Sequence, residues 1–247
     1  PVKSIEQQSM LAVHRLREGV KEDRNACINR IRGILLEFGV AIPTGVRALQ
    51  VTLDEVLEDA TNEMNGLARI TLRRAQAQWR ELNEHLDWCD ERIAAHAKDN
   101  DAVKHAATLM GIGPVGASAV VATVGDFKQF KNGAQFGAWL GLVPKQRSSG
   151  GKSNLGTITK RGDPYVRTLL VQGAKSVVNS AHTRTDPISR WVLALKERSG
   201  WQKAVVALAN KNARILWAVM TKGVAFDRHH VSVKPAAPAI MTTQPTT

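Results

Sequence analysis

The sequence is poor in the residues that cross-link a fold. Its 247 residues include only two cysteines, Cys27 and Cys89. Two cysteines cannot form a disulfide framework, and no Cys-x-x-Cys or His-x-x-x-His spacing suggests a zinc site. We therefore expect a reducing, intracellular compartment, with no metal and no cofactor bound by these residues.

The chain also lacks a long hydrophobic run. Its longest segment without Lys, Arg, Asp or Glu extends from His105 to Gly125, and three glycines and a proline lie near the middle of that segment. These residues would interrupt a membrane helix halfway. We expect no membrane partner.

Acidic residues are scarce in the second half of the chain only. Residues 1–141 carry 17 basic and 18 acidic side chains, a net charge of −1, whereas residues 142–247 carry 17 basic and 4 acidic ones, a net charge of +13. Clustered Lys and Arg bind a polyanion by releasing its condensed counterions, so nucleic acid is the favoured partner. The alternative is a basic face that only aids solubility, which so large an asymmetry disfavours.

Strand-like alternation is nearly absent and limited to residues 155–159. Apolar residues instead recur every three or four positions over 4–38 and 53–97, with a change of phase near Thr71, which predicts two long amphipathic helices. Shorter helices are predicted over residues 103–110, 115–124, 133–141, 164–180, 187–198 and 201–221.

The expected fold class is therefore mainly α. We predict a long antiparallel coiled-coil helical hairpin at 1–100, which would serve as a spacer or an oligomerisation arm. A compact helical domain containing a helix-hairpin-helix is predicted at 101–230. A disordered tail rich in Pro, Ala and Thr is predicted at 231–247.

A glycine-rich turn separates two of the predicted short helices. Gly111, Gly113 and Gly116 lie where a helix-hairpin-helix would turn. The helix after such a turn offers free backbone N–H groups to a DNA phosphate, which holds the duplex without reading its sequence. A tight turn between packed helices explains the same pattern equally well.

The segment from Pro144 to Asp163 concentrates cations and glycines around two adjacent serines, Ser148 and Ser149. A serine beside glycines is sterically open, and neighbouring cations can neutralise the charge that develops on an attacked phosphate. Chemistry alone nevertheless favours a loop that only grips phosphate, because the nearest acids are Asp126 and Asp163 and no base lies beside the serines. The candidate phosphate contacts are Arg147, Lys152, Lys160 and Arg161.

Tyr165 is the only tyrosine and is of the residue type that tyrosine recombinases use as nucleophile. Its place at the start of an apolar helix favours packing instead.

Several short motifs follow one another in a characteristic order. They are Met110–Pro114, Gly125–Phe127, Phe136–Pro144, Ser148–Lys152, Ile158–Asp163 and Val166–Leu170. In this order they resemble the C-terminal transposase domain of bacterial insertion sequences of the 110/116/902 family. Lys3–Gln8 and Asn29–Gly33 resemble the segment that precedes this domain, so the resemblance extends to about Asp227.

The resemblance implies a DNA recombinase that acts on double-stranded DNA, is guided by a structured RNA and works as a homo-oligomer, cytoplasmic and nucleoid-associated in bacteria. It implies that Ser149, with Ser148 as second candidate, forms a covalent phosphoserine link to DNA. Arg167, in the last motif, joins the candidate DNA contacts. A RuvC-like domain of another subunit would complete the site and bind Mg²⁺.

The chain departs from the family pattern at its beginning. No β-rich, RuvC-like segment with an Asp-Glu-Asp-Asp set is present, and the sequence opens on Pro1 rather than methionine. We therefore expect a partial transposase that is inactive by itself and whose Mg²⁺ site lies outside these residues. The alternatives are a non-catalytic nucleic-acid-binding scaffold that uses the basic loop as a phosphate grip, and a structural oligomerisation module.

Overall fold

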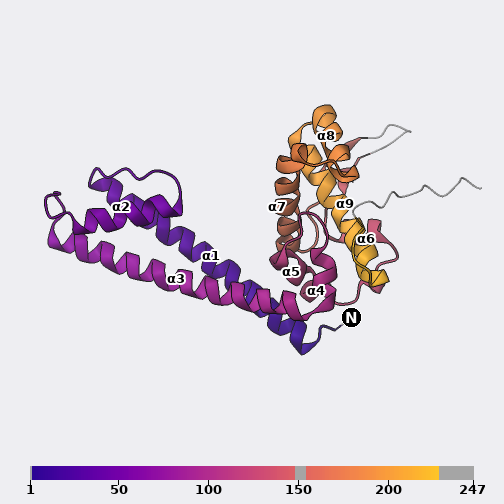
Figure 1. The fold of residues 1–247 in the computed structure, drawn as a ribbon, viewed down its shortest axis with the longest axis horizontal. Helices are drawn as coiled ribbons and strands as arrows, with labels where there is room; N and C mark the ends of the chain where they lie inside the picture. Colours follow the sequence, from indigo (N-terminus) through magenta and orange to yellow (C-terminus); the bar gives the residue numbers. More distant parts are fainter. Residues whose placement is uncertain (1, 148–153, 228–247) are drawn as a thin grey trace, which may run out of the picture.

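The computed structural model describes residues 2–147 and 154–227 and confirms a mainly α-helical fold (Figure 1). The elements are α1 (Ile5–Glu37), α2 (Val46–Glu58), α3 (Gly66–Asp99), α4 (Asp101–Ala107), α5 (Pro114–Val124), η1 (Phe127–Gln129), α6 (Gly133–Trp139), β1 (Pro144–Gln146), β2 (Leu155–Ile158), α7 (Pro164–Ser180), η2 (Ala181–Thr183), α8 (Pro187–Ser199) and α9 (Trp201–Lys222). The predicted tail at 231–247 lies outside the described residues.

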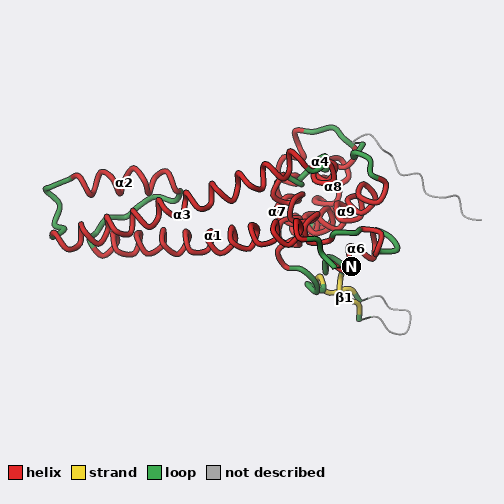
Figure 2. Tube along the Cα trace, turned by 90° about the horizontal axis from the view of Figure 1, so that it is seen from below, coloured by secondary structure: helices red, strands yellow, loops and turns green. Residues whose placement is uncertain are grey.

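The first three helices form a long arm. Helix α1 runs away from the compact domain and α3 returns beside it, while α2 folds back over their far end (Figures 1 and 2). Helix α1 begins after a capping box at Ser4, because the Ser4 hydroxyl accepts from the Gln7 N–H and the Gln7 side chain accepts from the Ser4 N–H. The fully buried side chains of the arm's own core include Ile31, Leu35, Leu49, Leu53 and Leu72.

The prediction of one helix over 53–97 is wrong, because α2 ends at Glu58 and α3 begins at Gly66. Local side-chain hydrogen bonds explain the break. The Asp59 carboxylate accepts from the Thr61 N–H at 2.8 Å and from its hydroxyl at 2.6 Å, which offers the backbone an alternative to the helix. The Arg69 guanidinium then donates to three carbonyl oxygens at the end of α2 and ties the two helices together.

The compact domain is built around α5. All residues of α5 from Ala117 to Val124 are buried, and the helix contacts α4 and α7 within the domain and α1 and α3 of the arm. Helix α9 packs against α6, α7 and α8. Helix α7 begins at Pro164, as predicted, and the Asp163 carboxylate before it caps the helix by accepting from the Val166 N–H at 3.0 Å.

Candidate nucleic-acid interface

Strands β1 and β2 flank the segment that holds the two serines. They pair antiparallel, with Pro144 opposite Ile158. The strand pairing agrees with the short β segment expected near 155–159. Four exposed cations stand on the two sides of residues 148–153: Lys145 and Arg147 before them, Lys160 and Arg161 after them. Arg147, Lys160 and Arg161 are among the predicted phosphate contacts, whereas Lys145 is not.

The base of this hairpin depends on a close approach between two backbone segments. Gly141 has a φ of +70° and Gly162 a φ of +89°, and a Cβ on either glycine would overlap backbone atoms of the opposite segment. Arg167 reinforces the contact, because its Nη1 donates to the carbonyl oxygens of Leu140 at 3.1 Å and Arg161 at 3.3 Å. Arg167 therefore holds the hairpin base, and its role as a DNA contact stays a prediction.

The predicted nucleophiles Ser149 and Ser148, and the predicted phosphate contact Lys152, lie outside the described residues. The two acids nearest to them in sequence have structural roles. Asp163 caps α7, and Asp126 caps the short helix η1 by accepting from the Lys128 N–H at 2.8 Å. Both carboxylates are therefore engaged at helix ends.

The glycine turn joins α4 to α5. Gly111 has a φ of +82°, and its carbonyl oxygen lies where a Cβ on Gly173 of α7 would have to sit. This close approach gives Gly111 a packing role. Gly113 is exposed and forms the N-cap of α5 without a side-chain cap, and Gly116 lies in the first turn. Binding of phosphate by these three glycines stays a prediction.

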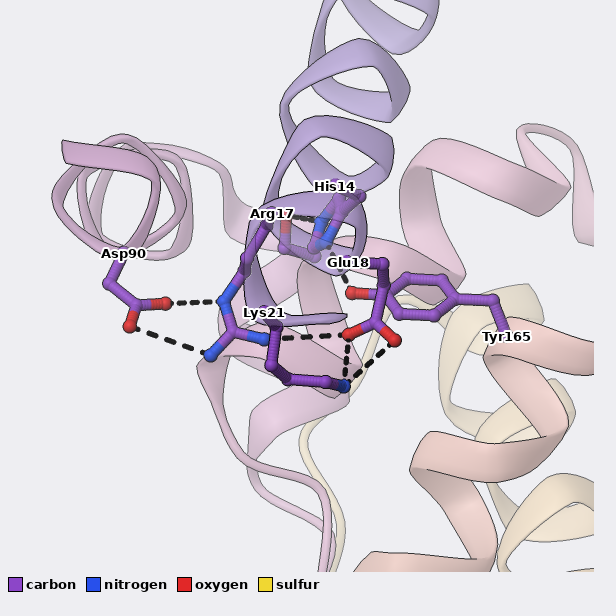
Figure 3. A network of polar contacts seen from close by, with 7 residues as sticks. His14, Arg17, Glu18, Lys21, Asp90 and Tyr165 are labelled. Atoms are coloured by element: carbon purple, nitrogen blue, oxygen red, sulfur yellow. Dashed lines mark hydrogen bonds and ion pairs between the residues drawn. The ribbon is translucent and has the colours of Figure 1, made fainter. Parts of the chain in front are cut away.

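A partly buried polar cluster joins the arm to the compact domain (Figure 3). The His14 ring of α1 lies 3.0 Å from the Tyr165 hydroxyl through Nδ1 and 2.9 Å from the Ser118 hydroxyl through Nε2. The same Ser118 oxygen lies 2.9 Å from Nδ1 of His96 in α3. These four residues, which we call the joint, connect α1, α3, α5 and α7, and they give Tyr165 the packing role expected of it.

Charged residues line the edge of the joint. Arg17 donates from Nε to the Asp90 carboxylate at 2.6 Å, and Lys21 binds Glu18 at 2.6 Å, as Figure 3 shows. Burial, with added repulsion from Arg17 and His96, lowers the pKa of His14 from 6.5 to about 4.

Tyr165 and His96, the other two titratable residues of the joint, are also held in the neutral form. Burial, together with the Glu18 charge, raises the pKa of Tyr165 to about 12. Burial also lowers the pKa of His96. At neutral pH the joint is therefore uncharged, and a single direction of donation can satisfy it: Tyr165 to His14, His14 to Ser118, Ser118 to His96.

A cleft of about 520 Å³ opens between η2 and the start of α8. Met110, just before the glycine turn, forms one wall, and Arg184 and Arg190 contribute two exposed guanidinium groups. Neither arginine lies among the phosphate contacts predicted from the sequence. In the sequence they are marked only by lying on either side of the helix start at Asp186–Pro187. That position does not reveal that Met110, 74 residues before Arg184, lies beside them.

Among residues 2–147 and 154–227, no group of three His, Cys, Asp or Glu side chains is placed to hold a metal ion. In the same part of the chain, no helix has the length and apolar character needed to cross a bilayer.

The fold and surface thus define a class of protein in which a long helical arm carries a compact helical domain. This domain exposes the strand pair β1–β2 with its flanking cations, which we call the basic hairpin. Residues 103–187 match the family model described as "Transposase IS116/IS110/IS902 family". The chain is 41% identical over 227 residues to a "Probable family 20 transposase" of Pseudomonas aeruginosa, covering 92% of this chain and 67% of the relative.

Two further relatives are transposases of named insertion sequences. The chain is 38% identical to the "Transposase for insertion sequence element IS1111A" of Coxiella burnetii, over 89% of this chain and 60% of that protein. It is 34% identical to the "Transposase for insertion sequence element IS1328" of Yersinia enterocolitica, over 90% of this chain and 66% of that protein.

The chain belongs to the IS116/IS110/IS902 transposase family. It spans 60 to 67% of the length of these three relatives.

Proposed function

We propose that this chain is the part of an insertion-sequence transposase that grips DNA and supplies a serine nucleophile for strand cleavage and exchange. One observation carries the proposal in a chain of this family: exposed cations stand on both sides of residues 148–153, with Lys145 in β1 and Arg147 just after it, and Lys160 and Arg161 after β2. Four cations around one segment suit the binding of a phosphodiester, because guanidinium and ammonium groups neutralise the charge on its oxygens.

In the proposed reaction the Ser149 oxygen forms a bond to phosphorus, and the bond from phosphorus to one deoxyribose oxygen breaks. The serine gives up its proton, and the leaving oxygen takes one up. These four cations, together with Lys152, stabilise the charge that develops on the phosphate. Gly111, Gly113 and Gly116 hold the duplex backbone at a second point.

The remaining parts of the site come from elsewhere. Asp126 and Asp163 are engaged as helix caps, so we infer that the general base belongs to another subunit of a homo-oligomer. The family implies Mg²⁺ in a RuvC-like domain, but the described residues bring together no donor set for it, and we derive no step through the metal. The net charge of +13 on residues 142–247 also suits a guide RNA as a second polyanion.

The test uses the full-length transposase with its guide RNA and a double-stranded DNA target. Ser149→Ala should abolish strand exchange and the denaturation-resistant protein–DNA adduct, while DNA binding stays within about twofold of wild type. Ser148→Ala is the matched control, because it removes a hydroxyl one residue away, and it should retain both activities.

Each other outcome points to a different reading. Wild-type exchange in Ser149→Ala together with loss in Ser148→Ala would move the nucleophile to Ser148. Exchange in the double variant would exclude a serine at this position and favour the non-catalytic phosphate grip. Exchange that is unchanged when the RNA is omitted would exclude RNA guidance.

A further inference from the structure

We propose that the cleft between η2 and α8 binds the phosphodiester backbone of a nucleic-acid strand through Arg184 and Arg190. The inference rests on the proposed function, but it adds a contact surface outside the basic hairpin. The cleft has a volume of about 520 Å³, which accommodates a sugar-phosphate unit.

The arginines of the cleft are available to a ligand. Arg184 donates from Nη1 only to the Met110 thioether sulfur, at 3.3 Å, which is a weak acceptor. Within residues 2–147 and 154–227, the Arg190 guanidinium makes no hydrogen bond or ion pair. Two guanidinium groups that lack a carboxylate partner match phosphate oxygens in geometry and charge.

The one acid in the cleft does not cancel this charge locally. The Asp186 carboxylate accepts from the N–H groups of Ile188 and Ser189 at 3.0 and 2.9 Å and from the Ser189 hydroxyl at 2.6 Å. Burial acts to raise the pKa of Asp186, but these hydrogen bonds lower it overall, so the carboxylate serves as the N-cap of α8. The first N–H groups of α8 are thereby used, and anion binding falls to the arginines.

The rest of the lining also favours a phosphate over an apolar ligand. Thr185 is exposed and adds a hydroxyl group, whereas the Thr183 hydroxyl donates to the Ser180 carbonyl oxygen at 2.8 Å, and the lining contains no aromatic ring. A pocket for an apolar small molecule would be lined mostly by hydrophobic and aromatic side chains.

The position of the cleft connects it to the glycine turn. Met110 forms part of its wall and directly precedes Gly111, and the Met110 carbonyl oxygen accepts from the buried Asn212 side chain at 2.9 Å. The wall is therefore held firmly from α9. Gly113, the exposed N-cap of α5, follows Met110 by three residues in the chain.

The test is fluorescence anisotropy of the full chain with labelled 30-mers of one sequence as double-stranded DNA, single-stranded DNA and double-stranded RNA. Arg184→Ala/Arg190→Ala should weaken binding about tenfold or more at 0.1 M salt. The slope of log K against log salt should become less steep by about one per lost arginine. Lysine at both positions should restore part of the affinity.

The matched control is Arg73→Ala/Arg74→Ala, which removes the same charge from exposed positions on α3 of the arm. It should leave affinity within about twofold. If the cleft variant loses more affinity for RNA than for DNA, or the reverse, the nucleic acid with the larger loss is the one that occupies the cleft. An equal loss of affinity shows that the cleft binds the phosphate backbone of either.

The inference is overturned if the cleft variant binds like wild type, or if the arm control loses as much affinity. The proposed function survives both of those results. It fails separately if the wild-type chain shows no salt-dependent binding to any of the three probes, and the cleft inference then falls with it.

Discussion

Ser118 shows at the residue scale how one hydroxyl group can organise a joint. Its oxygen meets nitrogens of His14 and His96, both at 2.9 Å, in a position with no solvent exposure. If both rings became charged, each would donate to Ser118, and the serine hydrogen would have no acceptor among the three residues. The joint is therefore matched to the neutral form of its histidines.

This neutrality makes the stability of the chain depend on pH. The pKa of His14 is about 4 in the folded protein and 6.5 in an unfolded chain, so on acidification the unfolded chain takes up the proton first. The stabilisation is complete above pH 6.5 and is lost as the pH falls toward 4, by about 3 kcal/mol at most. Urea unfolding at pH 7, 5.5 and 4.5 should show this decrease in the free energy of unfolding.

His14→Gln is the variant that assigns the effect. It should remove most of the fall between pH 6.5 and 4 and leave a smaller one from His96, whose pKa burial also lowers. An equal pH dependence in the variant and the wild type would show that other groups control stability in this range.

At the scale of elements, the approach of α7 to the glycine turn limits what the helix can carry. A Cβ on Gly173 would overlap the carbonyl oxygen of Gly111, which belongs to backbone and cannot move aside like a side chain. Alanine is favoured over glycine inside a helix by about 0.5–1 kcal/mol, but overpacking of this kind costs about 1–3 kcal/mol or more. Gly173→Ala should therefore lower the free energy of unfolding.

Gly19→Ala provides the matched comparison. Gly19 lies inside α1, and a Cβ there would meet nothing within 4 Å. Its substitution should raise the urea midpoint slightly while Gly173→Ala lowers it. A gain in stability for both variants would mean that α7 does not need the close approach.

The elements also show which parts of the fold are predictable from sequence. The starts of α1 and α7 follow from local signals, Ser4 and Asp163–Pro164, whose hydrogen bonds involve residues only three positions away. The break between α2 and α3 is not predicted, because apolar spacing continues through Leu57 and Met64 while side chains of the turn end the helix.

The joint and the cleft escape prediction for a different reason. His14 meets residues 104 and 151 positions away, and Arg184 meets Met110 from 74 positions away. Such contacts arise from the packing of helices and leave no periodic trace in the sequence. The basic hairpin was predictable because its cations and glycines are neighbours in the chain.

At the scale of the whole molecule, the joint should fix the direction of the arm. Ser118→Ala removes the hydroxyl that α1 and α3 share, whereas Thr123→Val on the same helix removes a buried hydroxyl with no partner among the described residues. Spin labels at Gln50→Cys on the arm and Lys203→Cys on the domain occupy exposed positions. The two native cysteines are buried, so they should not compete for the label.

The distance distribution between the two labels should be narrow in the wild type and in Thr123→Val, and clearly broader in Ser118→Ala. Equal widths in all three proteins would show that apolar packing around α5 is sufficient to hold the arm.

Because α1 is long, a small change of angle at the joint moves the far end of the arm by a large distance. Glu37 lies 23 residues beyond His14 on one continuous helix, a span of about 35 Å at 1.5 Å per residue. A rotation of about 10° at His14 would therefore carry the far end of the arm through roughly 6 Å, more than one helical turn. The position of the far end of the arm relative to the compact domain therefore depends on the angle at the joint, about 35 Å away.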